Sequence, residues 1–457
     1  MIKILFFSAH NPSSEEETRL LPLWPAYLAA YAGKNLGRGS LFFRYAAANF
    51  EHAIKDFKPD LVAMSAVTKN YGYAMECAGT AKKYNLPVIF GGPHITAIPG
   101  TLSGDMDAGC IGEGEQTFYE LVKLHIERGR FSPKDLENID GIVYRDGGQL
   151  VRTKPRIPMK TLDDLPHPER SLTGYKRRGY IHTARGCNYK CIFCSCSRLW
   201  PNIRFSSAES VVEEVRGLME NGVKVIRFND DNFAADKKRL IEISELVVKN
   251  GFEKKLKFSC WCRSNDVTPE VAGALKAMNI VSVKMGLESG CQKVLHFLKG
   301  NVTVDDNSNA VRLLKGAGLQ VNGDFIIGAP DETAEDMMET YRFIRDSGVD
   351  FVDINVLTPL PGTPLWDLAL RKKIITADVD WRILDFTSGR NAGRAPLLSE
   401  KLSRQQLLQM HKKFQRLRFM KTIRAIPHSP WLDEFFPVAF GRLKGAISRL
   451  HLQKAQA

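Results

Sequence analysis

Four of the nine cysteines of the chain lie in the segment RGCNYKCIFCSC (185–196). Thiolates bind zinc and iron–sulfur clusters, and in oxidising compartments cysteines form disulfides. Cys187, Cys191 and Cys194 have the spacing C-x₃-C-x₂-C directly after a predicted strand, so three thiolates of one loop can bind one metal centre. An iron–sulfur cluster normally takes four thiolates, and a set of three leaves one iron able to bind an outside ligand.

Other arrangements explain these cysteines less well. A structural zinc site needs four ligands, usually in two pairs, and Cys260 and Cys262 are a poor second pair because their C-x-C spacing lies in a predicted strand. Cys196 follows Cys194 by only two residues, where geometry disfavours binding to the same cubane. Disulfides are disfavoured because the N-terminal segment lacks the basic flank and cleavage site of a signal peptide, and because the number of cysteines is odd. We therefore favour a three-cysteine cluster.

The strand before the cysteines opens a series of six strand–helix units. The predicted strands are YIHTAR, VKVIRFND, KLKFSC, SVKMGLE, LQVNGDFIIG and FVDINVLTP, and helical segments separate them. Six such units predict a barrel or part of one, with its chemistry at the carboxyl ends of the strands. Asp230 and Asp231 follow the second strand and Glu288 follows the fourth, so we expect these carboxylates to lie near the cysteines.

The N-terminal part of the chain also alternates strands with helices, and its strands include IKILFF, PDLVAMSAV and LPVIFGGPH. This pattern predicts a doubly wound, Rossmann-like domain whose ligands bind at the carboxyl ends of parallel strands. The segments SAVTKNY (65–71), FGGPHITAIP (90–99) and GCIGEGEQTF (109–118) lie at consecutive strand ends. Glycines there let backbone amides approach a ligand closely, and Ser65 and Thr68 offer hydroxyl groups.

The chain is therefore predicted to be an α/β protein of several domains. We expect the Rossmann-like domain at 1–125, a connector with a hairpin at 126–178, a partial (β/α)₆ barrel at 179–371 and a basic helical region at 372–457. A length of 457 residues fits two or three domains. No apolar stretch reaches the about 18–20 residues that span a bilayer, and we expect a cytoplasmic protein.

The net charge of +13 is concentrated at the C-terminal end, where residues 401–457 hold twelve Lys and Arg against two Asp and Glu. A solvated helical tail is the simpler interpretation. The alternative is contact with anionic material, either a phosphorylated substrate or a membrane surface. The apolar segment WLDEFF (431–436) fits an amphipathic or lipid-linked substrate, and it fits an ordinary cap equally well. Binding to nucleic acid is not expected.

The cysteine loop, with Phe193 before its third cysteine, resembles that of the radical S-adenosylmethionine (SAM) superfamily. In that family three cysteines hold a [4Fe–4S] cluster, and the free iron binds the amino and carboxylate groups of SAM. The resemblance implies reductive cleavage of SAM to a 5′-deoxyadenosyl radical, with an electron donor such as flavodoxin or ferredoxin. It implies that Cys187, Cys191 and Cys194 bind the cluster. The SAM contacts that it implies are Phe193, Asp230, Asp231, Arg263 and Glu288.

Further segments extend this resemblance over residues 180–370. FNDDNF (228–233) stands where the family usually has Gly-Gly-Glu, and this departure leaves open whether Asp230 or Asp231 contacts the SAM amino group. GDFIIGAPDET (323–333) resembles the family's fifth-strand segment. PLPGTPLWD (359–367) is similar to the segment that ends the barrel in the cobalamin-associated branch.

The glycine-rich strand ends before the barrel resemble the cobalamin-binding domains of cobalamin-dependent radical SAM enzymes. No Asp stands two residues before His10, His52 or His94, so the Asp-x-His-x-x-Gly motif of the methionine-synthase type is missing. The lower face of cobalt is then left to Lys69, Asn70, Tyr71 or no residue, and hydrogen bonds to backbone explain His94 at least as well. A Rossmann-like domain without cobalamin is the alternative. The implied cobalamin contacts are Ser65, Thr68, Asn70, Tyr71, Gly91, Gly92, His94, Gly112, Glu113 and Gly114.

These resemblances imply methylation of an unactivated carbon, with methylcobalamin as the methyl source and two SAM consumed. Two alternatives stay open. One is a radical rearrangement, cyclisation or heteroatom exchange without methyl transfer, and the other is a non-catalytic cobalamin and iron–sulfur sensor or electron carrier. The substrate is expected to be a small or lipid-linked molecule that the C-terminal region helps to select.

Overall fold

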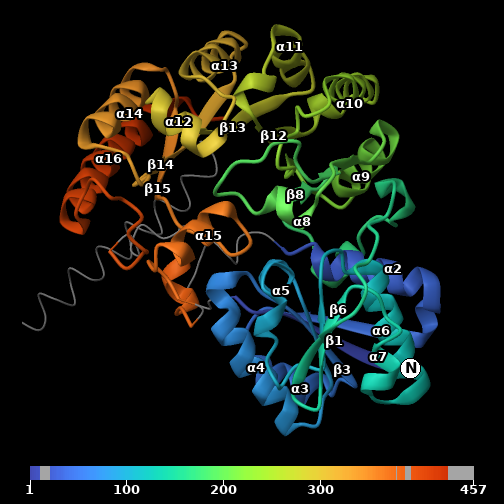
Figure 1. Ribbon diagram of the computed structural model, residues 1–457. Coiled ribbons are helices and arrows are strands. Elements are labelled where there is room, and N and C mark those ends of the chain that lie inside the picture. Colours follow the sequence, from blue (N-terminus) through green and yellow to red (C-terminus); the bar gives the residue numbers. More distant parts are fainter. Residues whose placement is uncertain (11–20, 377, 386–392, 431–457) are drawn as a thin grey trace, which may run out of the picture.

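The computed structural model describes residues 1–10, 21–376, 378–385 and 393–430. It contains two large sheets, one in the N-terminal domain and one in the barrel, and Figure 1 shows the two domains stacked with α8 (Cys196–Leu199) between them. The segment WLDEFF (431–436), for which a role in substrate selection was expected, lies outside the described residues.

The N-terminal sheet has the strand order β2-β1-β3-β4-β5-β6-β7, and its first five strands run parallel. This order confirms the predicted doubly wound domain, because the connections change direction between β1 and β3 and leave a binding edge there. The strands are β1 (Ile2–Ser8), β2 (Leu41–Ala46), β3 (Leu61–Ser65), β4 (Val88–Gly91), β5 (Ala108–Cys110), β6 (Ile142–Asp146) and β7 (Gln149–Arg152).

Helices cover both faces of this sheet, which is why β1 is a continuous apolar run rather than an alternating one. Phe6 points to the core under α2 and α6, and Phe7 points to the core under α3 and α4. Both side chains are fully buried. The helices of the domain are α2 (Trp24–Leu36), α3 (Phe50–Phe57), α4 (Tyr71–Lys83), α5 (Pro93–Ala97), α6 (Glu115–Arg128) and α7 (Pro133–Leu136).

The sequence prediction did not include β2, α3 or the short helices α5 and α7. β5 was expected only through the placing of GCIGEGEQTF at a strand end, since its three residues are too few to show a period, and β2 is an edge strand with Phe42 exposed. The hairpin expected in the connector is present as β6 and β7. Because β6 pairs antiparallel with β5, however, this hairpin extends the N-terminal sheet instead of standing between the domains.

The second sheet has six parallel strands in the order β15-β14-β13-β12-β11-β8. Strands that are neighbours in the chain are neighbours in the sheet, as in a (β/α) barrel, and β8 and β15 remain edge strands. The predicted partial barrel is therefore confirmed. The strands are β8 (Arg178–Ile181), β11 (Val225–Phe228), β12 (Lys257–Cys262), β13 (Ile280–Glu288), β14 (Gln320–Ile327) and β15 (Phe351–Val356).

The barrel strands alternate between a helix-facing side and a lumen-facing side. On β13, Val283 and Met285 are buried in the core beneath the helices, whereas Lys284 between them faces the lumen. The helices are α9 (Ala208–Glu220), α10 (Lys237–Lys249), α11 (Pro269–Ala277), α12 (Gln292–Lys299), α13 (Val304–Gly316), α14 (Ala334–Asp346) and α15 (Pro364–Arg371). The sequence prediction missed α12.

The basic C-terminal region contributes one long helix, α16 (Arg404–Ala425), which packs on β15 and α14 at the edge of the barrel (Figure 1). Ser403 and Gln406 form a capping box at its first turn, which satisfies backbone amides that a helix start leaves unpaired. Phe414 is buried against the barrel, and Phe419 of the same helix is exposed. Among the described residues, none of the helices combines the length and apolarity needed to cross a membrane.

We expect Phe414→Ala to lower the free energy of unfolding by about 3–5 kcal/mol, because it leaves a cavity between α16 and the barrel. Phe419→Ala is the matched control, since 65% of that side chain is already exposed, and it should change the free energy by less than about 0.5 kcal/mol. Denaturant unfolding of the apoprotein measures both. Equal effects would show that α16 is not anchored through Phe414.

Candidate active site

The three cysteines lie in a loop that a short antiparallel ladder closes. We call residues 186–203 the cluster loop; it begins after β9 (Ala184–Arg185) and ends before β10 (Arg204–Phe205), which pairs with β9. The closure is narrow at Gly186, whose φ is +100° and whose added Cβ would lie 2.9 Å from the carbonyl oxygen of Asn202. Only glycine fits there without moving the opposite backbone.

Two helices hold the middle of the loop. The backbone amide of Ile192 donates to the carbonyl of Leu298 in α12, and the carbonyl of Ile192 accepts from the amide of Leu365 in α15. The neighbouring Phe193, predicted to contact SAM, is half-buried against the apolar cluster that contains Leu298 and Leu365. The loop is therefore positioned by residues far away in the sequence.

Cys187, Cys191 and Cys194 are half-buried in this loop, whereas Cys196 is buried and turned to another partner. The Cys196 thiol donates to the Asp231 carboxylate across 2.8 Å, in the short helix α8 (Cys196–Leu199) that ends the loop. The three remaining cysteines are thus the thiols that this loop can offer to a metal centre.

The spacing of the sulfur atoms tests which centre fits. A single zinc ion bonds each thiolate at about 2.3 Å, so its ligand atoms must crowd together. Among the described residues, the only group of His, Cys, Asp or Glu with ligand atoms all within 4.8 Å of one another is Cys291, Asp336 and Glu339, so the three loop sulfurs stand farther apart. Wider spacing fits a cubane, which binds each thiolate through a different iron. Cys260 and Cys262, the second pair of the zinc alternative, are buried in the core beneath the barrel helices.

Two buried cations border the cysteines. The Arg263 guanidinium donates to the Cys191 sulfur across 3.1 Å and lies 3.7 Å from the centre of the Tyr189 ring. Lys299, in the unpredicted helix α12, is buried beside it, and Arg263 also donates to the Lys299 carbonyl. Burial lowers the pKa of Lys299, an effect that Glu288 partly offsets. Positive charge here would stabilise thiolates and an anionic cluster. No motif in the sequence pointed to Lys299 or Tyr189.

The adjacent carboxylates Asp230 and Asp231 have different environments. Asp230 is buried, accepts from the backbone amides of Thr183 and Ala184 at 2.6 and 3.1 Å, and accepts from the Thr183 hydroxyl. Burial raises the pKa of Asp230 to about 6. Asp231 is exposed at the mouth beside the cluster loop, where its contact is the Cys196 thiol. Asp230 therefore joins the segment after β11 to the segment after β8, and Asp231 is the more accessible of the two carboxylates.

Glu288 lies at a β-bulge at the end of β13 with a φ of +61°, a left-handed conformation that is uncommon for residues other than glycine. An added Cβ at Gly286 would lie 2.2 Å from the Glu288 carboxylate, so a larger residue there would displace that side chain. Burial raises the pKa of Glu288 to about 7, although the Lys299 ammonium lies 3.9 Å away. The strained backbone thus turns a buried carboxyl group toward the two cations.

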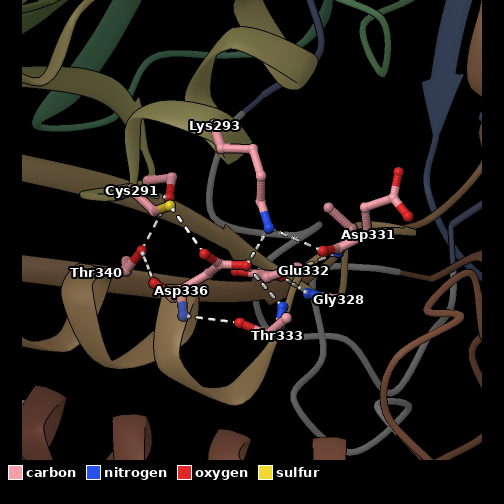
Figure 2. Close-up of polar contacts among 10 residues, drawn as sticks. Cys291, Lys293, Gly328, Asp331, Glu332, Thr333, Asp336 and Thr340 are labelled. Carbon is pink, nitrogen blue, oxygen red and sulfur yellow. Dashed lines mark hydrogen bonds and ion pairs between the residues drawn. The ribbon is translucent and has the colours of Figure 1, made fainter.

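A polar network ties the loop after β13 to the loop after β14 (Figure 2). The Asp336 carboxylate accepts from the Cys291 thiol at 3.4 Å and from the Lys293 ammonium at 2.5 Å. Glu332 is buried and accepts from the backbone amides of Gly328 and Ala329. The Lys293 ammonium already occupies the place that a cation would take beside Asp336, and it also donates to the carbonyl of Asp331, so this group fixes the GAPDET segment against α12.

The barrel lumen holds a second charged group, which the sequence did not single out. The Lys284 ammonium lies 3.0 Å from Asp324 and 3.0 Å from Asp353, on three neighbouring strands, and 4.6 Å from the centre of the Trp261 ring. Burial raises the pKa of Asp324 to about 6. Arg418 of α16 contacts Asp353 from the open side. The lumen therefore presents a polar wall below the cysteines.

On the N-terminal domain, the predicted cobalamin contacts line the carboxyl edge of the sheet. Gly92, with a φ of +98°, lets β4 pack against β3, because its Cβ would lie 2.5 Å from the Ser65 hydroxyl. Gly112, with a φ of +84°, has no atom within 4 Å of its Cβ position, so the chain there is open to a ligand. An open edge with a ligand-accessible glycine fits the approach of a flat group such as a corrin.

His94 is fully buried between other rings. Its Nδ1 lies 3.3 Å from the Thr68 hydroxyl and its Nε2 3.0 Å from the Thr101 hydroxyl, and its ring stacks on Tyr71 at 3.9 Å. Burial lowers the pKa of His94 to about 3. Both nitrogens are engaged by hydroxyl groups, not by backbone, and the ring is therefore structural.

The other residues considered for the lower face of cobalt are also engaged. Tyr71 donates to the carbonyl of Thr101, and Lys69 forms an ion pair with Asp385 at 3.2 Å. Asn70 is buried. Gly91 ends β4, and Gly114 precedes α6. Glu113 between Gly112 and Gly114 points to the barrel, where Arg204 donates to its carboxylate.

The fold and this site define a class of proteins in which a doubly wound domain is joined to an open barrel with a three-cysteine loop. The family described as the B12 binding domain matches residues 17–122, and the Radical SAM superfamily matches residues 181–344. An uncharacterized methyltransferase of Pyrococcus horikoshii is 35% identical over 343 residues, which are 72% of this chain and 73% of that protein.

Two further proteins illustrate the range of similar chains. The anaerobic magnesium-protoporphyrin IX monomethyl ester cyclase of Cereibacter sphaeroides is 27% identical over 92% of this chain and 70% of its own length. The solved structure of the radical SAM methyltransferase TsrM from Kitasatospora setae, with cobalamin and a [4Fe–4S] cluster bound, has a TM-score of 0.67 and 17% identity over 81% of this chain and 75% of that chain. At that identity the similarity concerns the fold.

The chain belongs to the radical SAM superfamily, in the branch that carries a B12-binding domain. It is a cobalamin-dependent radical SAM enzyme, and its cofactors are a [4Fe–4S] cluster, SAM and cobalamin.

We expect Cys194→Ala to abolish the four-iron cluster after anaerobic reconstitution, because two thiolates remain. Cys196→Ala is the matched control two residues away and should retain about four irons per chain, since its thiol is bonded to Asp231. Iron and sulfide analysis with the visible spectrum measures both. Loss of iron in Cys196→Ala with retention in Cys194→Ala would reverse the assignment.

Proposed function

We propose that the protein methylates an unactivated carbon of a small-molecule substrate. The observation that carries this proposal is the contact between the two cofactor-binding regions: α5, directly after Gly92 on the cobalamin edge, packs on α8 of the cluster loop. The relative of Pyrococcus horikoshii, named as a methyltransferase, supports the same reaction. When bound, the cluster with SAM supplies radical chemistry and cobalamin supplies a methyl donor.

Cys187, Cys191 and Cys194 would hold the cluster, and the bond from Cys196 to Asp231 keeps a fourth thiolate away from it. The site can then accept the amino and carboxylate groups of SAM. Asp231 is the exposed carboxylate for an ammonium group, and Arg263 offers a guanidinium for a carboxylate.

Phe193 and Glu288 complete the proposed SAM contacts. Phe193 offers an aromatic ring within the loop, and Glu288 is a buried carboxyl group on a strained backbone beside Lys299. Such strain is retained where the surrounding structure holds a side chain in a functional position.

The proposed cobalamin contacts comprise two groups. Gly91, Gly92, Gly112 and Gly114 would let the corrin approach the backbone at the sheet edge, and Ser65 offers a hydroxyl group there. Thr68, Asn70, Tyr71 and His94 are buried beside the edge and would shape the walls of a slot rather than bind cobalt.

The substrate would lie in the lumen, between the cysteines and the wall formed by Lys284, Asp324 and Asp353. These charged groups can bind a polar part of the substrate, while the carbon to be modified faces the mouth. An electron donor of the flavodoxin or ferredoxin class would reduce the cluster. A phosphorylated or lipid-linked substrate would meet the positive charge of α16 at the open side.

A second candidate is radical ring closure without methyl transfer. The anaerobic cyclase of Cereibacter sphaeroides favours it, because that enzyme aligns with 92% of this chain. The residues that bind cofactors serve both reactions, so the outcome depends on how the lumen holds the substrate.

Untargeted comparison of metabolites between wild-type and Cys191→Ala strains, grown with methyl-labelled methionine, tests the proposal. A product that carries the labelled methyl group, formed together with S-adenosylhomocysteine and 5′-deoxyadenosine by the purified enzyme, is expected. 5′-Deoxyadenosine without S-adenosylhomocysteine would favour ring closure or another rearrangement. Absence of SAM cleavage by fully reconstituted protein would support the sensor or carrier alternative.

We expect Asp231→Ala to weaken SAM binding by about 10-fold or more, because an ammonium–carboxylate hydrogen bond contributes about 1.5–3 kcal/mol. Its stability should change little. Asp230→Ala is the matched neighbour and should instead lower the free energy of unfolding by about 2–4 kcal/mol, since it leaves buried amides unpaired. Equilibrium binding and denaturant unfolding separate the effects. A SAM defect confined to Asp230→Ala would assign the contact to that residue.

A further inference from the structure

The ladder that closes the cluster loop brings two like charges together. Arg185 of β9 and Arg204 of β10 are direct partners in the antiparallel register, and such partners project from the same side of the ladder. Arg185 lies two residues before Cys187, and Arg204 follows the last residue of the cluster loop. Like charges directly opposite each other destabilise a strand pair, so the closure needs neutralising partners.

Those partners come from the other domain. Glu113 accepts two hydrogen bonds from Arg204, at 3.0 and 2.5 Å, and lies 3.1 Å from the Arg185 guanidinium. Glu115 accepts two from Arg185, at 3.2 and 2.5 Å. Both glutamates follow β5 in the segment GEGE, which also contains Gly112 of the open cobalamin edge. We call these four side chains the interdomain clamp.

The clamp is sheltered from water, which strengthens its interactions. The side chains of its four residues are between 7% and 14% exposed. Burial tends to raise the pKa of Glu113, but hydrogen bonds from Arg204 and the charge of Arg185 outweigh it and hold the pKa below its usual value. Further contacts hold the arginines in place: Arg204 donates to the carbonyl of Met159, and Arg185 lies over the Tyr27 ring. Bidentate, desolvated pairs of this kind are rigid.

We propose that Glu113 and Glu115 are positioning residues that couple the cobalamin edge to the cluster loop, so that cobalamin binding and SAM binding strengthen each other. A corrin that orders the chain at Gly112 also orders the adjacent Glu113 and Glu115, and through the arginines it orders both ends of the loop that carries Cys187. SAM then binds to a loop that is already ordered, so its binding free energy does not have to offset the conformational entropy lost on ordering. By linkage, SAM raises cobalamin affinity by the same factor.

This inference rests on the cofactor assignments of the proposed site, but it does not depend on methyl transfer. It also changes the interpretation of Glu113, which the family resemblance placed among the cobalamin contacts. Its carboxylate oxygens are both used by arginines of the barrel. A cobalamin contact at this loop would then come from the glycine backbone and not from the glutamate side chain.

The test is the dissociation constant of SAM for cluster-reconstituted protein, measured by SAM-induced change in the cluster spectrum, with and without hydroxocobalamin. In the wild type, cobalamin should tighten SAM binding by about 5-fold or more, within the range of measured couplings. In Glu113→Gln and Glu115→Gln this ratio should fall toward one, because the neutral amide no longer neutralises the arginines. In the absence of SAM, the two variants should bind cobalamin with an affinity within about 2-fold of the wild type. The glutamates are proposed to affect only the coupling between the two sites, and not the cobalamin site itself.

Glu214→Gln is the matched control. Glu214 pairs with Arg170 at 2.5 Å, and both side chains are 11% exposed, as are those of Glu113 and Arg204. Glu214 lines the same pocket as Arg185, but its ion pair is with Arg170 and not with an arginine of the ladder, so it controls for the loss of a nearby negative charge. It should keep the wild-type ratio. The double variant Glu113→Gln/Arg204→Gln removes one charge of each sign, which protects folding, and it should still lack coupling.

Three results would overturn the inference: a wild-type ratio near one with both cofactors bound, an equal loss in Glu214→Gln, or a Glu113→Gln variant that loses cobalamin affinity while Glu115→Gln does not. The last result would mark Glu113 as a direct cobalamin contact. Failure of wild-type protein to bind cobalamin or a four-iron cluster would instead contradict the cofactor assignments. The two failures are therefore distinguishable.

Discussion

Neutralisation of Arg185 and Arg204 by glutamates of the N-terminal domain is the interaction on which the site depends. Without Glu113 and Glu115, two guanidinium groups would face each other across a two-residue ladder in a sheltered place. Burying two unneutralised guanidinium groups costs more free energy than the pairing of two residues on each strand contributes. The loop that bears the cysteines is therefore closed by charges that belong to another domain, and the cluster region is a product of both domains.

Existing hydrogen bonds decide which polar residues remain able to bind a ligand. Asp230, His94 and Cys196 all have the right chemistry for a cofactor, but each has partners within the protein. Buried polar groups need such partners, since an unpaired one costs about 1–3 kcal/mol. Asp231, which is exposed beyond its bond to Cys196, and the half-buried thiols of Cys187, Cys191 and Cys194 stay accessible. The site is thus defined as much by the residues that are occupied as by those that are open.

Regular periodicity explains where prediction from sequence succeeded. The six barrel strands and most of their helices have clear apolar patterns, and they pair in chain order because parallel strands with helical crossovers favour sequential neighbours. The three residues of β5 show no period of their own, and α12 was missed because its eight residues make only about two helical turns. The hairpin β6–β7 was found by its DGG turn, but its pairing with β5 depends on contacts that no local pattern encodes.

The sequence alone determined the class of chemistry, since the spacing of Cys187, Cys191 and Cys194 is local and one loop can present it. It also determined the two α/β domains, because strand and helix periods are local properties. Only the tertiary structure paired Asp230 with buried backbone amides, bonded Cys196 to Asp231, and brought Lys299 and Arg263 to the cysteines. These outcomes depend on burial and on contacts between distant segments. Side chains compete for partners only after the chain has folded, and the result of that competition is not written in any single segment.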